Sequence, residues 1–222
     1  MTSTPPTRQR SQRRDAQRNR ARILEATREA FGERGLDVGV DEIARRAGVG
    51  MGTLYRHFPT KDALIDAIVD ARFEQLTASA EEALTAPDAW YGLVGFLDAA
   101  VALQSTDRGF KDALAARSRD ERGVKLARRR LHAALGRLVE RAQAEGVLRA
   151  DVTLEDVIVL LWATGRIVER AADVAPGAIR RFLQVHLAGL RPAAAQGDPL
   201  DVPPLTPRQI ERATAPARRQ KG

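Results

Sequence analysis

Hydrophobic residues recur at helical spacing along most of this chain, and two short helices are predicted within residues 39–61, GVDEIARRAGVGMGTLYRHFPTK. Positions spaced i, i+3, i+4 and i+7 predict one buried face on the first of them: Val40, Ile43, Ala44 and Ala47. Gly48 follows, where a helix that ends in the left-handed region favours a residue without Cβ. The second short helix is predicted from Met51 to Phe58, because Pro59 ends it.

The remaining hydrophobic pattern also predicts helices, and no alternating runs of valine, isoleucine and threonine indicate strands. The further predicted helices span residues 18–33, 60–84, 88–104, 110–116, 119–145, 153–172 and 176–190. Thr60 and Thr153 are predicted to cap two of them, with Asp156 as the acid that completes a capping box at the second. The fold class predicted from the sequence is all-α.

The helices group into two domains with irregular ends. Residues 1–17 lack an apolar face and are predicted to be a disordered basic arm, and residues 192–222 a disordered tail. Residues 18–65 form a three-helix domain that contains the two short helices, and residues 66–191 form a helical bundle. The helix that begins after Thr60 is long enough to bridge the two domains.

Charge and composition indicate which binding partners and which kinds of site are compatible with this sequence. The formal net charge is +7 and the isoelectric point is about 10.6, which suits a polyanionic partner. The absence of cysteine excludes disulfides, thiolate metal sites and a cysteine nucleophile. No stretch reaches the roughly 18 apolar residues of a membrane span, and no apolar segment follows the N-terminal arginines as in a secretory signal. A cytoplasmic location is expected.

A helix, a tight glycine turn and a second helix with polar and aromatic groups are typical of a DNA-binding helix-turn-helix. An ordinary helical hairpin is the simpler alternative, and the content of the second helix argues against it. Side chains that hydrogen-bond or attract phosphates are Tyr55, His57 and Lys61. The groups placed to face base edges, with Thr53 and Arg56 as the main readers, are Gly50, Met51, Gly52, Thr53 and Arg56.

Arginines are concentrated just before this motif. Between Arg8 and Arg22 the only acidic residue is Asp15. The segment is either a solvated tail or an arm that contacts phosphates or the minor groove, and its position next to the motif favours an arm in which Arg18 and Arg20 contact DNA. The basic run at residues 125–130 and the cations of the C-terminal tail are better explained as solvated surface.

The string AxxAGVGxGTLYRHFPTKDAL resembles the DNA-binding domain of the TetR family of bacterial transcriptional regulators. The resemblance covers about Arg18–Val69, and its most specific part is Gly48–Lys61. It implies a ligand-responsive repressor, a homodimer on a palindromic double-stranded DNA operator, and a phosphate-contacting lysine at Lys61. Family members usually carry threonine near the start of the second helix; Gly39 stands here and is a weaker cap.

The resemblance also implies a small-molecule pocket in the C-terminal bundle, so that this domain binds the ligand and dimerises. The candidate pocket residues, each of which has a plain core role as its alternative, are Trp90, Phe96, Phe110, His132, Trp162 and Arg166. Few charges interrupt the apolar faces, which favours an apolar or weakly polar effector. The helices at 153–172 and 176–190 are apolar over most of their girth and would pair in a four-helix dimer interface, the alternative being a core within one chain.

An enzyme is disfavoured. His57, His132 and His186 are far apart in sequence, and no metal-binding or nucleophile motif occurs. The glycines of Gly48–Gly52 follow no strand, so they do not form a phosphate-binding loop. No cofactor is expected. An architectural DNA-coating protein is a second alternative, but it would not need a second apolar domain.

Overall fold

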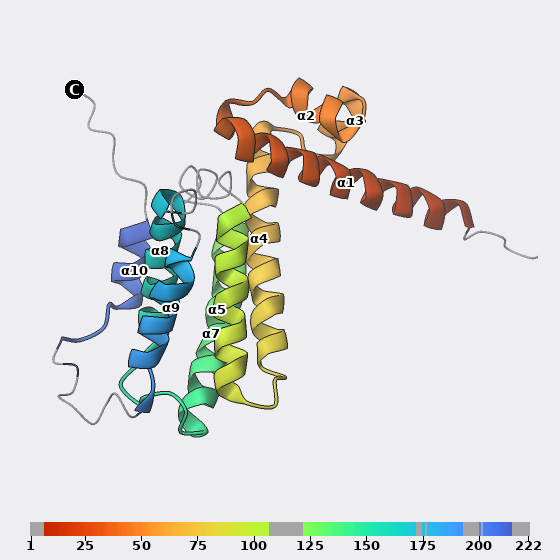
Figure 1. Ribbon diagram of the computed structural model, residues 1–222. Helices are drawn as coiled ribbons and strands as arrows, with labels where there is room; N and C mark the ends of the chain where they lie inside the picture. The colour runs from red at the N-terminus through yellow and green to blue at the C-terminus, as the bar shows by residue number, and fades with distance from the viewer. Residues whose placement is uncertain are drawn as a thin grey trace, which may run out of the picture. The chain divides into compact units, whose positions relative to one another are not determined.

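The computed structural model describes residues 7–106, 122–171, 175, 177–192, 200 and 202–214, and every regular element in these ranges is helical (Figure 1). The elements are α1 Thr7–Arg34, the 3-10 turn η1 Gly35–Asp37, α2 Val40–Ala47, α3 Met51–His57, α4 Lys61–Ala83, α5 Ala89–Thr106, α7 Arg122–Ala144, α8 Leu154–Ala171, α9 Ala178–Gly189 and α10 Pro207–Thr214. The all-α prediction is confirmed. The helix predicted at residues 110–116 lies outside the described residues. None of the described helices is both long and apolar enough to cross a membrane.

The described chain forms two compact units, and the division falls within α4, after Val69. In the first unit, α1 packs against α2, and the start of α4 completes the core. The side chains buried there include Ile23, Ala26, Ala30, Phe31, Ile43, Ala44, Ala47, Leu54, Phe58, Leu64, Ile65 and Ile68. Because burial of one large apolar side chain is worth about 1.5–3 kcal/mol, this cluster holds two short helices that would not be stable alone.

The first helix begins earlier than the sequence pattern predicted. It starts at Thr7 rather than near Arg18, so residues 7–17, predicted to be disordered, are helical. That prediction relied on the lack of an apolar face, whereas arginine, glutamine and alanine have high intrinsic helix propensity. The structure does not describe residues 1–6.

The second unit is a helical bundle. In it α5 packs against α7 and α8, and α8 packs against α9. Its buried side chains include Phe73, Leu93, Phe96, Leu97, Leu131, Leu135, Leu138, Val157, Leu160 and Leu183. The predicted capping box at α8 is confirmed, because Asp156 accepts from the Thr153 backbone N–H at 2.8 Å and its own N–H donates to Thr153 Oγ1 at 3.4 Å.

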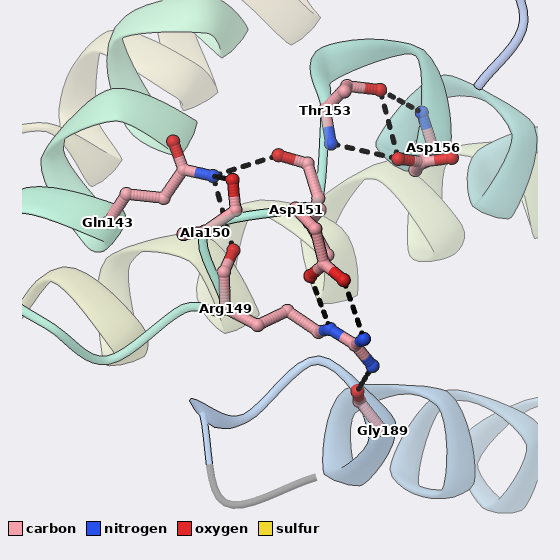
Figure 2. Close-up of polar contacts among 8 residues, drawn as sticks. Gln143, Arg149, Ala150, Asp151, Thr153, Asp156 and Gly189 are labelled. Atoms are coloured by element: carbon pink, nitrogen blue, oxygen red, sulfur yellow. Dashed lines mark hydrogen bonds and ion pairs between the residues drawn. The ribbon is translucent and has the colours of Figure 1, made fainter. Parts of the chain in front are cut away.

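The loop between α7 and α8 fastens the C-terminal end of α9 (Figure 2). Gln143 Nε2 donates at 2.8–3.3 Å to the carbonyl oxygens of Arg149, Ala150 and Val152. The buried Arg149 guanidinium binds both carboxylate oxygens of Asp151 at 2.6 and 2.7 Å and donates to the Gly189 carbonyl at 3.4 Å. This hydrogen bonding lowers the pKa of Asp151. Since the last carbonyls of a helix lack partners within it, the loop both caps α9 and fixes its place.

The turn from α4 to α5 is held from α7. Arg141 Nη1 donates to the Leu84 carbonyl at 2.7 Å, and Arg141 Nε pairs with Glu145 at 2.8 Å. The other carboxylate oxygen of Glu145 accepts from the Ala89 N–H at the start of α5, at 3.0 Å. The pair of Arg141 in α7 and Glu145 directly after it therefore holds both the end of α4 and the beginning of α5.

The C-terminal tail also differs from its prediction. Residues 207–214, expected to be disordered, form α10, whose Ile210 is buried. The reason lies in local sequence: Thr206 and Gln209 form a capping box, in which Gln209 Oε1 accepts from the Thr206 N–H at 2.7 Å and the Gln209 N–H donates to Thr206 Oγ1 at 3.3 Å.

Candidate nucleic-acid interface

The turn between α2 and α3 has the geometry that its glycine predicts. Gly48 has φ 62° and ψ 39°, the left-handed conformation, and its N–H donates to the Arg45 carbonyl at 3.1 Å. The N–H of Val49 donates to the Ala44 carbonyl, also at 3.1 Å. These bonds satisfy the last carbonyls of α2 and turn the chain directly into α3.

The short helix α3 has one buried and one open side. Leu54 and the following Phe58 are 0% and 2% exposed, as their spacing predicts, whereas Met51 and Tyr55 are 38% and 44% exposed. The other predicted base-facing groups are open or partly open: Gly50, Gly52 and Arg56 are exposed, and Thr53 is half-buried. Seven residues of α3 therefore place most of the predicted DNA-facing groups together.

The structure places three of the predicted DNA-contacting residues at the C-terminal end of α3 and the start of α4: Arg56, His57 and Lys61. Arg56 Nε donates to the Gly52 carbonyl at 3.2 Å, so its guanidinium turns back along α3 toward the start of the helix. Lys61 is half-buried at the first position of α4, and the neighbouring Thr60 caps that helix by accepting from the Ala63 N–H at 3.1 Å. His57, the last residue of α3, is also half-buried.

The arginines of α1 are tied to the helix-turn-helix. The guanidinium of Arg20 lies over the Phe58 ring, 4.6 Å from its centroid. Arg22 Nη2 donates to the Gly48 carbonyl at 3.3 Å, which joins α1 to the turn before α3. Arg18 pairs with Asp15 on its own helix. The sequence did not distinguish Arg22 from its neighbours, because its partner is 26 positions away.

A second brace joins α2 to α1. Arg46 pairs with Glu33 of α1 at 2.7 Å and with Glu42 of α2 at 2.8 Å, and Arg45 pairs with Glu42 at 2.7 Å. Hydrogen bonds from Arg46 and then from Arg45 lower the pKa of Glu42 to about 2. The ion pair between Glu42 and Arg46 could be predicted from their i, i+4 spacing. The ion pair between Arg46 and Glu33 could not, because it depends on how α1 and α2 pack.

This brace predicts an acid-sensitive first unit. Because the pKa of folded Glu42, about 2, lies below the ordinary value of 4.5, its ion pairs stabilise the fold above pH 4.5 and are lost as the pH falls toward 2. Melting temperatures of the wild type and Glu42→Gln, measured across this range, should converge as the pH falls. A difference that stays constant with pH would contradict this role of the carboxylate.

The candidate pocket residues lie in several parts of the second unit. Trp90, at the start of α5, is buried beneath Arg191, whose guanidinium is 3.7 Å from the ring centroid. Phe96 is 1% exposed within the core. His132 of α7 and Trp162 of α8 are half-buried. Phe110 and the side chain of Arg166 lie outside the described part of the chain, and the pocket role of all six residues stays a prediction.

Apolar side chains remain exposed on the two helices predicted to dimerise. Val159 of α8 is 38% exposed and Val185 of α9 is 61% exposed in the single chain. Phe182 and Leu187 of α9 are half-buried, whereas Ile179 and Leu183 pack with Val101 in an intrachain cluster. These helices thus serve a core within one chain and still present apolar surface.

Comparison with known proteins agrees with this geometry. Residues 23–68 match the family model of bacterial regulatory proteins of the TetR family, and residues 86–192 match that of the Transcriptional regulator SbtR-like C-terminal domain. An HTH-type transcriptional regulator of Staphylococcus aureus, SAR0097, is 40% identical over 85 residues, which are 37% of this chain and 44% of that protein. The chain therefore spans less than half the length of this curated relative.

Similarity to solved structures covers much more of the chain. A TetR transcription regulatory protein from Mycobacterium vanbaalenii is 38% identical and superposes with a TM-score of 0.64, over 81% of this chain and 98% of its own. The TetR transcriptional regulator SCO0520 from Streptomyces coelicolor is 33% identical, with a TM-score of 0.63 over 78% and 98%. The resemblance seen in the sequence is confirmed: this chain belongs to the TetR family of bacterial transcriptional regulators.

Proposed function

We propose that this protein is a ligand-responsive repressor that binds a roughly palindromic DNA operator as a homodimer in the cytoplasm. The observation that carries the proposal is the open side of α3, which is braced on its other side by the buried Leu54 and Phe58. A short helix presented in this way fits the major groove. It lies next to a turn that Arg22 holds in place.

Phosphate contacts supply affinity and register in this proposal. Tyr55, His57 and Lys61 meet the backbone on either side of the groove, and Arg18 and Arg20 add charge from α1. Arg20 suits this role because its guanidinium lies over the Phe58 ring beside α3 while the residue is exposed, so its N–H groups are available to phosphates.

Base reading rests on few side chains. Arg56 pairs with guanine and Thr53 contacts a thymine methyl, while Gly50, Met51 and Gly52 allow the start of α3 to approach the base edges closely. Because so few groups read bases, DNA shape and the spacing of two half-sites supply the rest of the specificity.

A second copy of the chain provides the second recognition helix. The exposed Val159 and Val185 favour a contact through α8 and α9, where two copies form a four-helix interface. An apolar or weakly polar effector binds within the bundle of the second unit. It releases the operator by binding more tightly to a dimer whose recognition helices do not match successive grooves.

Two measurements test this proposal. Solution mass at micromolar concentration should be twice 24.3 kDa, and the protein should retard duplex DNA from its own promoter region in preference to unrelated duplex. The logarithm of the affinity should fall steeply with the logarithm of salt concentration. A monomer, or retardation without any sequence preference, contradicts the proposal.

A further inference from the structure

The first part of α1 is a helix without a core. Among the side chains of this 28-residue helix that the structure describes, Ile23 is the first buried one, and those before it are exposed, apart from the half-buried Asn19. Figure 1 shows this part of α1 extending beyond α2 and α3. Most helices in proteins owe their stability to a packed apolar face. The segment Thr7–Arg22 therefore needs another source of helix stability.

Its charges oppose helix formation in the free protein. The first turn contains no acidic residue, so nothing there complements the positive end of the helix dipole. Arginines recur four residues apart, which places like charges next to each other on the helix, at positions 10, 14, 18 and 22. The pair between Asp15 and Arg18 is exposed and offsets little of this repulsion. A polyanion alongside the helix would attract the arginines that otherwise repel one another and would complement the positive end of the helix dipole, so both effects would then favour the helix.

The base of the extension is fixed next to the recognition helix. Arg20 stacks on Phe58, the residue that ends α3, and Arg22 binds Gly48 in the turn before α3. The helix therefore leaves the folded unit beside α3. Its roughly 16 residues, at about 1.5 Å each, reach about 24 Å, which equals about seven base pairs at 3.4 Å per pair.

We propose that the part of α1 before Arg18 is stabilised as a helix by DNA flanking the operator, where its arginines contact phosphates beyond the bases that α3 reads. The inference rests on the proposed function, since it needs a protein already placed on duplex DNA. In the free protein this part of α1 frays from its N-terminal end, whereas Arg20 and Arg22 hold its base. The frayed part is stabilised by the flanking DNA backbone. It lengthens the DNA footprint without adding base specificity.

Hydrogen–deuterium exchange of the full-length protein tests the folding step. Two duplexes from the retarded promoter fragment are compared, one trimmed to the footprint of the helix-turn-helix and one with about ten further base pairs on each side. Amides 7–17 should exchange rapidly without DNA, remain rapid on the trimmed duplex and become protected only on the flanked one. Protection in the free protein, or equal protection on both duplexes, would overturn the proposal, as would ordering by vesicles of anionic phospholipid but not by the flanked duplex.

Charge variants test the role of the arginines. The variant with Arg8, Arg10, Arg13 and Arg14 changed to glutamine keeps helix propensity and removes four charges. Its matched control makes the same change in the tail, at Arg208, Arg218, Arg219 and Lys221. On the flanked duplex the first variant should bind at least tenfold more weakly, with a salt slope reduced by about 0.9 for each phosphate that the protein no longer neutralises. On the trimmed duplex the first variant should bind with the affinity of the wild type. The tail control should bind both duplexes with the affinity of the wild type.

The outcomes separate the two proposals. If the wild type shows no sequence preference, the function proposed above fails. If the wild type binds selectively and the α1 variant binds the flanked duplex as the wild type does, only the flanking helix is refuted. Equal weakening in the tail control would assign the effect to net charge and refute it as well.

Discussion

Replacing Arg56 by alanine should leave a folded protein that still binds DNA but no longer distinguishes one base pair in each half-site. Arg56 is exposed on α3, and its Nε–H···O bond to Gly52 directs the guanidinium toward the start of the helix, where bases would lie. One bidentate arginine–guanine pair is worth about 1–3 kcal/mol of discrimination. The measurement is the affinity for a selected operator and for its single base-pair substitutions, in wild type and Arg56→Ala.

Tyr55→Ala and Lys61→Ala are the matched comparisons, because both residues are assigned to phosphates. Each should weaken binding to all duplexes by a similar factor. Lys61→Ala should reduce the salt slope by about two, because each of the two protomers on the operator neutralises one phosphate fewer. If Arg56→Ala weakens every duplex equally while Tyr55→Ala changes base preference, the roles assigned to these side chains are reversed. Circular dichroism confirms that each variant is folded.

Gly92→Ala should destabilise the second unit, and Gly95→Ala in the same helix should stabilise it. A Cβ added at Gly92 would lie 2.4 Å from the Ala83 carbonyl oxygen at the end of α4, which is backbone and is held by the turn that Arg141 and Glu145 bridge. Overpacking of this kind costs about 1–3 kcal/mol. A Cβ at Gly95 would meet no atom within 4 Å, so alanine there should gain about 0.5–1 kcal/mol in helix propensity.

Urea unfolding of the two variants measures the change in the free energy of unfolding that each alanine causes. The midpoint should fall for Gly92→Ala and rise for Gly95→Ala, with DNA binding of the folded protein unchanged in both. Equal stabilisation by the two alanines would mean that the close approach of α5 to the end of α4 does not constrain position 92.

Features set by neighbouring residues could be predicted from the sequence. Gly48 adopts the left-handed conformation, and Thr60 and Thr153 cap their helices as expected, because each depends on residues at most four positions away. The apolar spacing of α2 correctly predicted that Ile43, Ala44 and Ala47 are buried, whereas Val40, also expected on that face, is half-buried. The errors at Thr7 and at α10 have the opposite origin: helix propensity and a capping box act without an apolar face, and the pattern of apolar residues does not register them.

Contacts between distant residues could not be predicted. The stacking of Arg20 on Phe58 and the bond from Arg22 to Gly48 depend on how α1 crosses the helix-turn-helix, which periodicity does not encode. The same holds for Arg149, which joins a loop to the end of α9. Trp90 was named as a pocket candidate, and its neighbour Arg191, which lies 101 positions further along the chain, could not be predicted.

Selection of bound duplexes from a random pool by the full-length protein tests the central claim most directly. A homodimer that reads DNA through α3 should enrich an inverted repeat whose half-sites are about 10 base pairs apart, centre to centre, or a multiple of that distance. Arg56→Ala should enrich the same repeat with one position in each half-site relaxed. Enrichment of no sequence, or of a single unrepeated site, would contradict a symmetric repressor that reads its operator through this helix.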